Sequence, residues 1–226
     1  MRDWIKRSIA HYTFSNRNDK ELIQLFCRSL KAGDIMLKVI NPSKFFNRGV
    51  RLVQKLTGHL NYDIGHAGIM RDSVVIIEAQ SKGLEERSLL QKNVDVGYIV
   101  YRATNPNLAE GAAIAAKLLY EIHMQHKSIS YNNRGLFPSV FFRPKKPKTA
   151  DEMEKIYQKI IHAHNSPMFC SQFVVYSYQW AATQMGIPSQ QIFNIDDKRA
   201  NPARLAEILQ GNPQFSEIGY MIANER

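Results

Sequence analysis

Apolar and polar positions alternate in short runs through the first half of the chain. The runs are rich in Val, Ile and other apolar residues, and Gly, Asp and Ser separate them. This pattern is typical of half-buried strands joined by turns. We therefore expect four or five strands, at residues 34–40, 64–70, 74–80, 84–88 and 97–102.

Apolar residues at three- and four-residue spacing mark the helices. Residues 107–122 combine this spacing with good helix formers, and an amphipathic region up to about residue 30 is expected to be helical. Further helices are expected at 149–164, after residue 170 and at 203–209. Strands followed by helices on one side predict an α+β domain.

A chain of 226 residues can bury a core without disulfides or a second domain. We therefore expect a single domain over residues 1–226, with residues 1–30 as an N-terminal helical extension. Residues 128–164 are expected to form an insertion, whose loop-like part contains Tyr131, Phe137, Phe141 and Phe142. It is either a lid or substrate wall beside a functional site or an ordinary surface excursion. Residues 188–202 are a candidate for a further loop over the site.

Cys170 stands where Ser166 and Pro167 lead into an apolar helix. The first turn of a helix has unpaired N–H groups and a partial positive charge, which favour a thiolate and can also hold an oxyanion. This position predicts a nucleophile for acyl transfer. The alternative is a buried cysteine that acts as a small core side chain.

His66 and Glu78 lie on two strands that form a predicted hairpin. With the turn centred on Asp72, Met70 pairs with Val74, Gly68 with Ile76, and His66 with Glu78. Directly opposed residues have Cβ atoms about 5 Å apart, so the carboxylate would orient the imidazole and stabilise its protonated form. This prediction depends on the register, because a slip of one residue would place the two side chains on opposite faces.

Several short motifs carry a family resemblance. They are Gly33-Asp34-Ile35, Gly65-His66-Ala67-Gly68-Ile69, Val75-Ile76-Ile77-Glu78-Ala79, Phe169-Cys170-Ser171-Gln172-Phe173-Val174 and Asn201-Pro202-Ala203-Arg204-Leu205. Together they resemble the circularly permuted papain-like superfamily, the branch of NlpC/P60 hydrolases in which the histidine precedes the cysteine, with the lecithin retinol acyltransferase type as a relative. The resemblance covers roughly residues 31–205.

The resemblance implies a permuted papain-like fold, in which an antiparallel sheet or partial barrel packs against helices, with a Cys-His-acid site. It assigns Cys170 as nucleophile, His66 as general base and Glu78 as the third member, with Asp63 as an alternative third member. Further candidates for oxyanion or substrate contacts are Ser171, Gln172 and Tyr62.

The function expected from this resemblance is hydrolysis of an amide bond by a cysteine nucleophile, with peptidoglycan stem peptide as the leading substrate. One alternative is a lipid acyl hydrolase or acyltransferase, and another is a binding module that keeps the fold without catalysis. Related domains include antibacterial effectors, such as those of type VI secretion. That relation adds a cognate immunity protein and secretion machinery as candidate partners.

The chain is basic, with a formal net charge of +10 and a pI of about 9.6. A basic surface attracts anionic cell-wall polymers and acidic lipids. The run at residues 143–148 lacks the aromatic residues that stack on bases, so we expect a solvated loop there and no nucleic-acid partner.

The remaining residues limit the compartment and the cofactors. Two cysteines, Cys27 and Cys170, give no disulfide framework and favour a reducing environment. The sequence has neither an apolar secretory signal nor a membrane-spanning run, so we expect a cytoplasmic protein unless a specialised system exports it. No cofactor or metal is expected, because the histidines, including His162 and His164, lack metal-site spacing and no phosphate-binding loop occurs.

Overall fold

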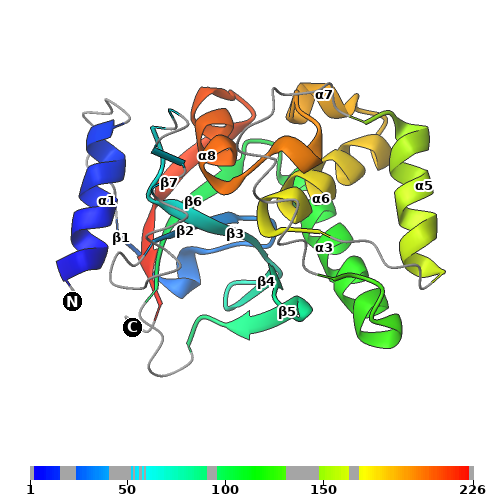
Figure 1. The fold of residues 1–226 in the computed structure, drawn as a ribbon, viewed down its shortest axis with the longest axis horizontal. Coiled ribbons are helices and arrows are strands. Elements are labelled where there is room, and N and C mark those ends of the chain that lie inside the picture. The colour runs from blue at the N-terminus through cyan, green and yellow to red at the C-terminus, as the bar shows by residue number, and fades with distance from the viewer. Residues whose placement is uncertain are drawn as a thin grey trace.

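A mixed sheet forms the centre of the computed structural model, which describes residues 3–15, 24–40, 52, 54–55, 58, 60–90, 96–130, 148–162 and 168–223 (Figure 1). Within these ranges the sheet has seven strands in the order β1-β7-β6-β2-β3-β4-β5. Its strands are β1 (Gln24–Leu25), β2 (Ile35–Val39), β3 (Ile64–Met70), β4 (Val75–Gln80), β5 (Gly83–Ser88), β6 (Gly97–Ala103) and β7 (Phe215–Ile222). All neighbours are antiparallel except β1 and β7.

Helices pack against this sheet, which confirms the predicted α+β class. They are α1 (Asp3–Ser15), α3 (Pro106–His126), α5 (Ala150–Ile161), α6 (Cys170–Gln184), α7 (Ser189–Ile192) and α8 (Pro202–Gly211), with 3-10 turns η1 (Cys27–Ser29) and η2 (Asp197–Arg199). In Figure 1, α1 lies at one end of the molecule and α5 at the other, with the sheet, α6 and α3 between them. The strands predicted between residues 34 and 102 are all present within one residue at each end.

Strand alternation divides the core between the two faces of the sheet. On β2, Ile35, Leu37 and Val39 belong to the larger cluster, which also contains the apolar faces of α3 and α6. Met36, between them, points to a smaller cluster that includes Tyr98. The period of two residues thus places α3 and α6 on one face and leaves the other face to a thinner layer.

The prediction of helix up to residue 30 is wrong in part. Residues 3–15 are helical, but Gln24 and Leu25 form a short strand parallel to β7, and η1 follows it. β7, whose edge supplies this pairing, was not predicted from the sequence. Backbone bonds to a distant strand therefore override the helical propensity of the segment.

The first helix is tied to the core by its apolar face. Ile5, Ile9 and Tyr12 follow a spacing of four and three residues and are buried. The hydroxyl of Tyr12 shares a hydrogen bond with Tyr101 of β6 and accepts another from the side chain of Gln210 of α8 at 2.9 Å. These contacts hold α1 against β6 and α8.

The start of the predicted insertion lies beside the residues directly before Cys170. The N–H of Met168 donates to the carbonyl of Ser130 at 2.8 Å. Within the insertion, α5 begins with a capping box between Thr149 and Glu152, and Tyr157 stacks on Trp180 of α6. The predicted aromatic loop lies at residues outside the described ranges.

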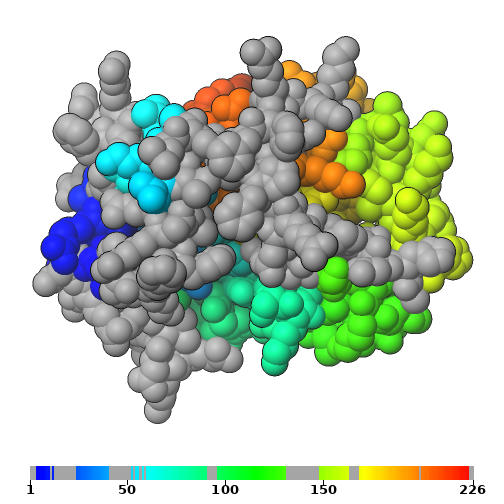
Figure 2. All heavy atoms as spheres, viewed as in Figure 1, coloured from blue at the N-terminus to red at the C-terminus, as the bar shows by residue number. Residues whose placement is uncertain are grey.

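At the other edge of the sheet, the β4–β5 hairpin meets α3. Described residues of the two are adjacent on the molecular surface (Figure 2). At this joint Gly83, the first residue of β5, has a φ of 112° and leaves room for the ring of His123.

Candidate active site

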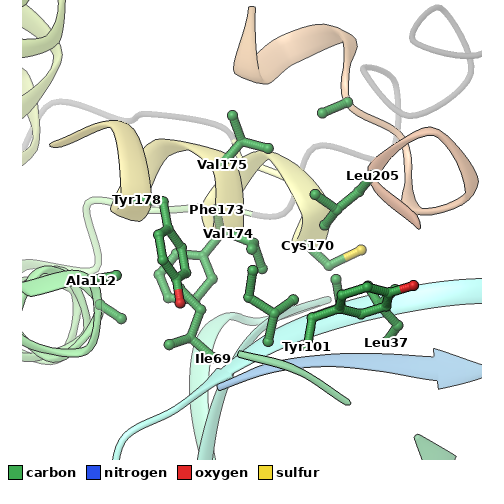
Figure 3. Packing of buried hydrophobic residues seen from close by; sticks show 14 of the residues in the cluster. Leu37, Ile69, Tyr101, Ala112, Cys170, Phe173, Val174, Val175, Tyr178 and Leu205 are labelled. Carbon is green, nitrogen blue, oxygen red and sulfur yellow. The ribbon is translucent and has the colours of Figure 1, made fainter. Parts of the chain in front are cut away.

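Cys170 is the first residue of α6, as its sequence context predicts. Phe169 before it is extended, and the thiol is fully buried. In Figure 3 it projects from the end of the helix beside Leu205, while Phe173 lies over the sheet. The N–H groups of Ala67 and Ser171 both donate to the sulfur.

The sulfur reaches β3 because the strand separates from β4 at this point. The ladder between β3 and β4 pairs Gly68 with Glu78 and ends there, whereas β2 continues to pair with β3 as far as Ile64. Helix α6 contacts both β3 and β4. Ala67 can therefore direct its N–H to Cys170 instead of to a neighbouring strand.

The ring of His66 hydrogen-bonds to Cys170. The Nε2 atom of the ring lies 3.5 Å from Oε1 of Glu78 and 3.2 Å from the amide nitrogen of Gln80. With Nε2 directed to β4, Nδ1 is the ring nitrogen left for the thiol. The structure thus brings the three residues predicted for catalysis into one chain of contacts.

Glu78 is held by more than His66. Its Oε2 accepts from Arg87 of β5 at 2.6 Å and from Gln80 at 3.0 Å, and the carboxylate is almost fully buried. The same Arg87 nitrogen donates to the hydroxyl of Tyr98 at 2.7 Å. The donors from Arg87 and Gln80 thus satisfy one oxygen of this buried carboxylate.

The predicted hairpin register is wrong. Glu78 pairs with Gly68, so the residue across from His66 in this register is Gln80. Asp72 is not at the centre of the turn: its side chain accepts from the N–H groups of Val74 and Val75, both at 2.8 Å, which lengthens the turn. Each residue of β3 thus pairs with a β4 residue two positions later than predicted. A displacement by two positions preserves the face, so His66 and Glu78 remain on the same face and meet diagonally.

Gly68 provides the space for this diagonal contact. A Cβ atom at this position would lie 2.8 Å from Cγ of Glu78 and from Cδ1 of Ile76. The absence of a side chain therefore lets Glu78 lie across β3 toward the histidine.

The other candidates lie at different distances from this chemistry. The side chain of Asp63 is buried before β3, but the carboxylate that acts on His66 is that of Glu78. Tyr62 lies under the ammonium group of Lys55, 5.7 Å from its ring centre. Ser171 is fully buried and contributes its backbone N–H to the sulfur.

The side chain of Gln172 is directed away from the thiol. It donates to Oδ2 of Asp197 at 2.8 Å, and Lys148 also pairs with Asp197 and with Asp196. Lys148 was expected in a solvated loop, but its side chain is only 11% exposed. Two nearby carboxylates hold it there, and this cluster joins the start of α6 to η2 and to the segment that leads into α5.

Burial alone raises the pKa of the Cys170 thiol, but the positive charge and hydrogen bond of His66 outweigh it, so the pKa is lowered. Burial alone lowers the pKa of His66. Cys170 and Glu78 raise this pKa by more than burial lowers it, so the net shift is upward. Lys38, opposite His66 on β2, acts against this shift. These opposite shifts favour a thiolate beside an imidazolium.

Sequence reasoning missed Gln80, Arg87 and Tyr98. Gln80 could have been found, because it follows Glu78 by two residues and so shares its face. Arg87 and Tyr98 reach the site from β5 and β6, and only the strand order brings them there.

Within the described part of the chain, no three His, Cys, Asp or Glu side chains are grouped so that they could hold a metal ion. No helix described in the structure is long and apolar enough to cross a membrane. A scan against models of protein families gives no match, and a search of curated proteins also finds no match.

Proposed function

We propose that this protein is a cysteine hydrolase with a permuted papain-like site. The observation that carries the proposal is the chain of contacts from Cys170 through His66 to Glu78. Burial of the thiol would also suit a core cysteine. A core cysteine, however, has no need of an imidazole whose other nitrogen lies beside a buried carboxylate, and this difference favours a reactive thiol.

In the proposed reaction, the thiolate of Cys170 attacks the carbonyl carbon of an amide. The C–S bond forms, and the carbonyl electrons move to an oxyanion that first-turn N–H groups of α6 stabilise. His66 gives its proton to the leaving nitrogen as the C–N bond breaks. Water then attacks the thioester while His66 takes a proton from it, which releases the acid and restores the thiol.

The proposed bond is an amide in a peptidoglycan stem peptide. The net charge of +10 supports this choice, because a basic protein is attracted to an anionic wall polymer. The thiol site itself is equally able to attack a lipid ester. The assay therefore has to include both substrate classes.

The test is mass analysis of purified wall fragments and of lipid vesicles after incubation with the protein. We expect new amine and carboxylate ends in stem peptides with wild type and with the control variant Cys27→Ala, and none with Cys170→Ala. Products from lipid alone would support the thiol chemistry but would show that the substrate is a lipid ester and not a stem peptide. Equal products from Cys170→Ala and wild type, or none from either, would refute the proposed hydrolase.

A further inference from the structure

Glu78 and Gln80 meet the same atom of the candidate base. Nε2 of His66 lies 3.5 Å from a carboxylate oxygen of Glu78 and 3.2 Å from the amide nitrogen of Gln80. The carboxylate can only accept a hydrogen bond, and the amide nitrogen can only donate one. Glu78 therefore favours a proton on Nε2 by its charge, whereas a hydrogen bond from Gln80 requires a lone pair there.

The orientation of the Gln80 amide follows from its second contact. Its nitrogen is also 3.0 Å from Oε2 of Glu78, which Arg87 contacts at 2.6 Å. An amide oxygen in that place would face a carboxylate oxygen with no hydrogen between them. The nitrogen consequently faces both Glu78 and His66.

We propose that Glu78 and Gln80 act on Nε2 of His66 in opposite senses, with Glu78 stabilising the protonated ring and Gln80 the neutral ring. Gln80 is then a positioning residue that limits the pH range over which the ion pair with Cys170 survives. This inference rests on the proposed thiolate and imidazolium pair.

The other charges around His66 come from three strands and one helix. Lys38 of β2 disfavours the protonated ring, and the thiolate of Cys170 on α6 favours it. Arg87 of β5 pairs with Glu78. Glu78 and Gln80 on β4 are the groups whose contacts distinguish the two states of Nε2.

The test follows the ring nitrogens of His66 by NMR against pH, with the signals assigned from His66→Gln. In Gln80→Met we expect the ring to lose its proton at a pH higher by about 0.5 to 1 unit, the size of one hydrogen bond. In Glu78→Gln we expect a shift to lower pH. Gln158→Met is the matched control, because Gln158 bonds Glu154 on the exposed face of α5 and should leave His66 unchanged.

No shift, or a shift to lower pH, in Gln80→Met would overturn the inference, and Gln80→Ala repeats the measurement if the first variant does not fold. Alkylation by iodoacetamide in a Cys27→Ser background separates this failure from that of the hydrolase. If wild-type Cys170 is alkylated rapidly at pH 6, the ion pair of Cys170 and His66 is supported. A missing or downward shift of the His66 titration in Gln80→Met then overturns the role of Gln80 alone. Slow alkylation at pH 6 overturns the ion pair together with this inference.

Discussion

His66 and His123 lie against the same β-hairpin and are held in opposite states. At His66 the partners are a thiol and a carboxylate. They raise the pKa of the ring overall, although burial alone would lower it. At His123 burial and the charge of Lys127 lower the pKa. Both rings are largely withdrawn from water, so burial does not explain the difference.

Among the described residues, His123 has backbone partners and no carboxylate or thiol beside it. Its Nδ1 accepts from the N–H of Ile129 at 3.3 Å. A bond to the backbone of Lys82 raises the pKa of the ring, but burial and the charge of Lys127 outweigh it. Because a backbone N–H cannot accept a hydrogen bond, a proton on Nδ1 would face another proton. The ring of His123 therefore joins α3 to the hairpin in its neutral form, and a positive charge on it would not be stabilised. The comparison shows that ionisable partners, more than depth, distinguish a reactive histidine from a structural one.

The largest expected effect is on the reactivity of Cys170. Replacing His66 by Gln removes the positive charge that favours the thiolate, so the thiol should return to ordinary or weaker acidity. At pH 6 a thiol with a pKa of about 8.5 is ionised to well under 1%, so alkylation by iodoacetamide should fall by about 100-fold or more. The rate is measured by mass spectrometry in a Cys27→Ser background.

His123→Asn is the matched control for this measurement. Asparagine keeps an acceptor for the N–H of Ile129, and His123 is not among the groups that shift the pKa of Cys170. We expect its alkylation rate to remain within about twofold of wild type, as for a change remote from the reacting group. Equal losses in both variants would mean that the two histidines do not differ as described.

The second effect is on stability, and it compares the glycines beside the two histidines. Alanine at Gly83 would have a φ of 112° and a Cβ atom 2.4 Å from the ring of His123. We expect Gly83→Ala to lower the free energy of unfolding by about 2 to 4 kcal/mol, from backbone strain and overpacking. Urea denaturation measures this loss.

The matched change at the site is Gly68→Ala. The added Cβ atom meets the side chains of Glu78 and Ile76, which have some freedom to move, so we expect a smaller loss of about 1 to 2 kcal/mol. It should nevertheless slow alkylation of Cys170 at pH 6, because Glu78 is displaced from His66. A Gly83→Ala protein that loses reactivity as strongly as Gly68→Ala while still folded would contradict this separation.

Local patterns in the sequence were sufficient for the strands and for the position of Cys170. Both depend on neighbours along the chain: alternation fixes a strand face, and the Ser-Pro sequence precedes the helix start. The shared face of His66 and Glu78 followed from the same alternation. It survived the error in register, because a displacement by two residues preserves the face.

The remaining features depend on segments that are distant in sequence. β7 was missed because the register shifts between Val100 and Tyr101 of β6, which leaves Ile218 as an extra residue and interrupts the alternation. The short strand β1 requires β7 as its partner. Arg87 and Tyr98 join Glu78 only through the strand order. Side-chain capping by Asp72 set the turn length, and with it the place of Gln80.

The smallest effect expected is the dependence of stability on pH at His123. Because its folded pKa lies below the ordinary value of 6.5, the unfolded chain binds the proton more readily. The stabilising effect of the neutral ring is therefore present above about pH 6.5 and is lost as the pH falls through the folded pKa. The loss is about 1.4 kcal/mol for each pH unit that separates the folded pKa from the unfolded pKa.

His123→Asn has no proton to bind, so between pH 7.5 and 5 it should lose less stability than wild type in urea denaturation. Contributions from His66 and Cys170 are common to both proteins and cancel in the difference. An equal loss in the two proteins would show that His123 is not held neutral, and the contrast with His66 would then disappear.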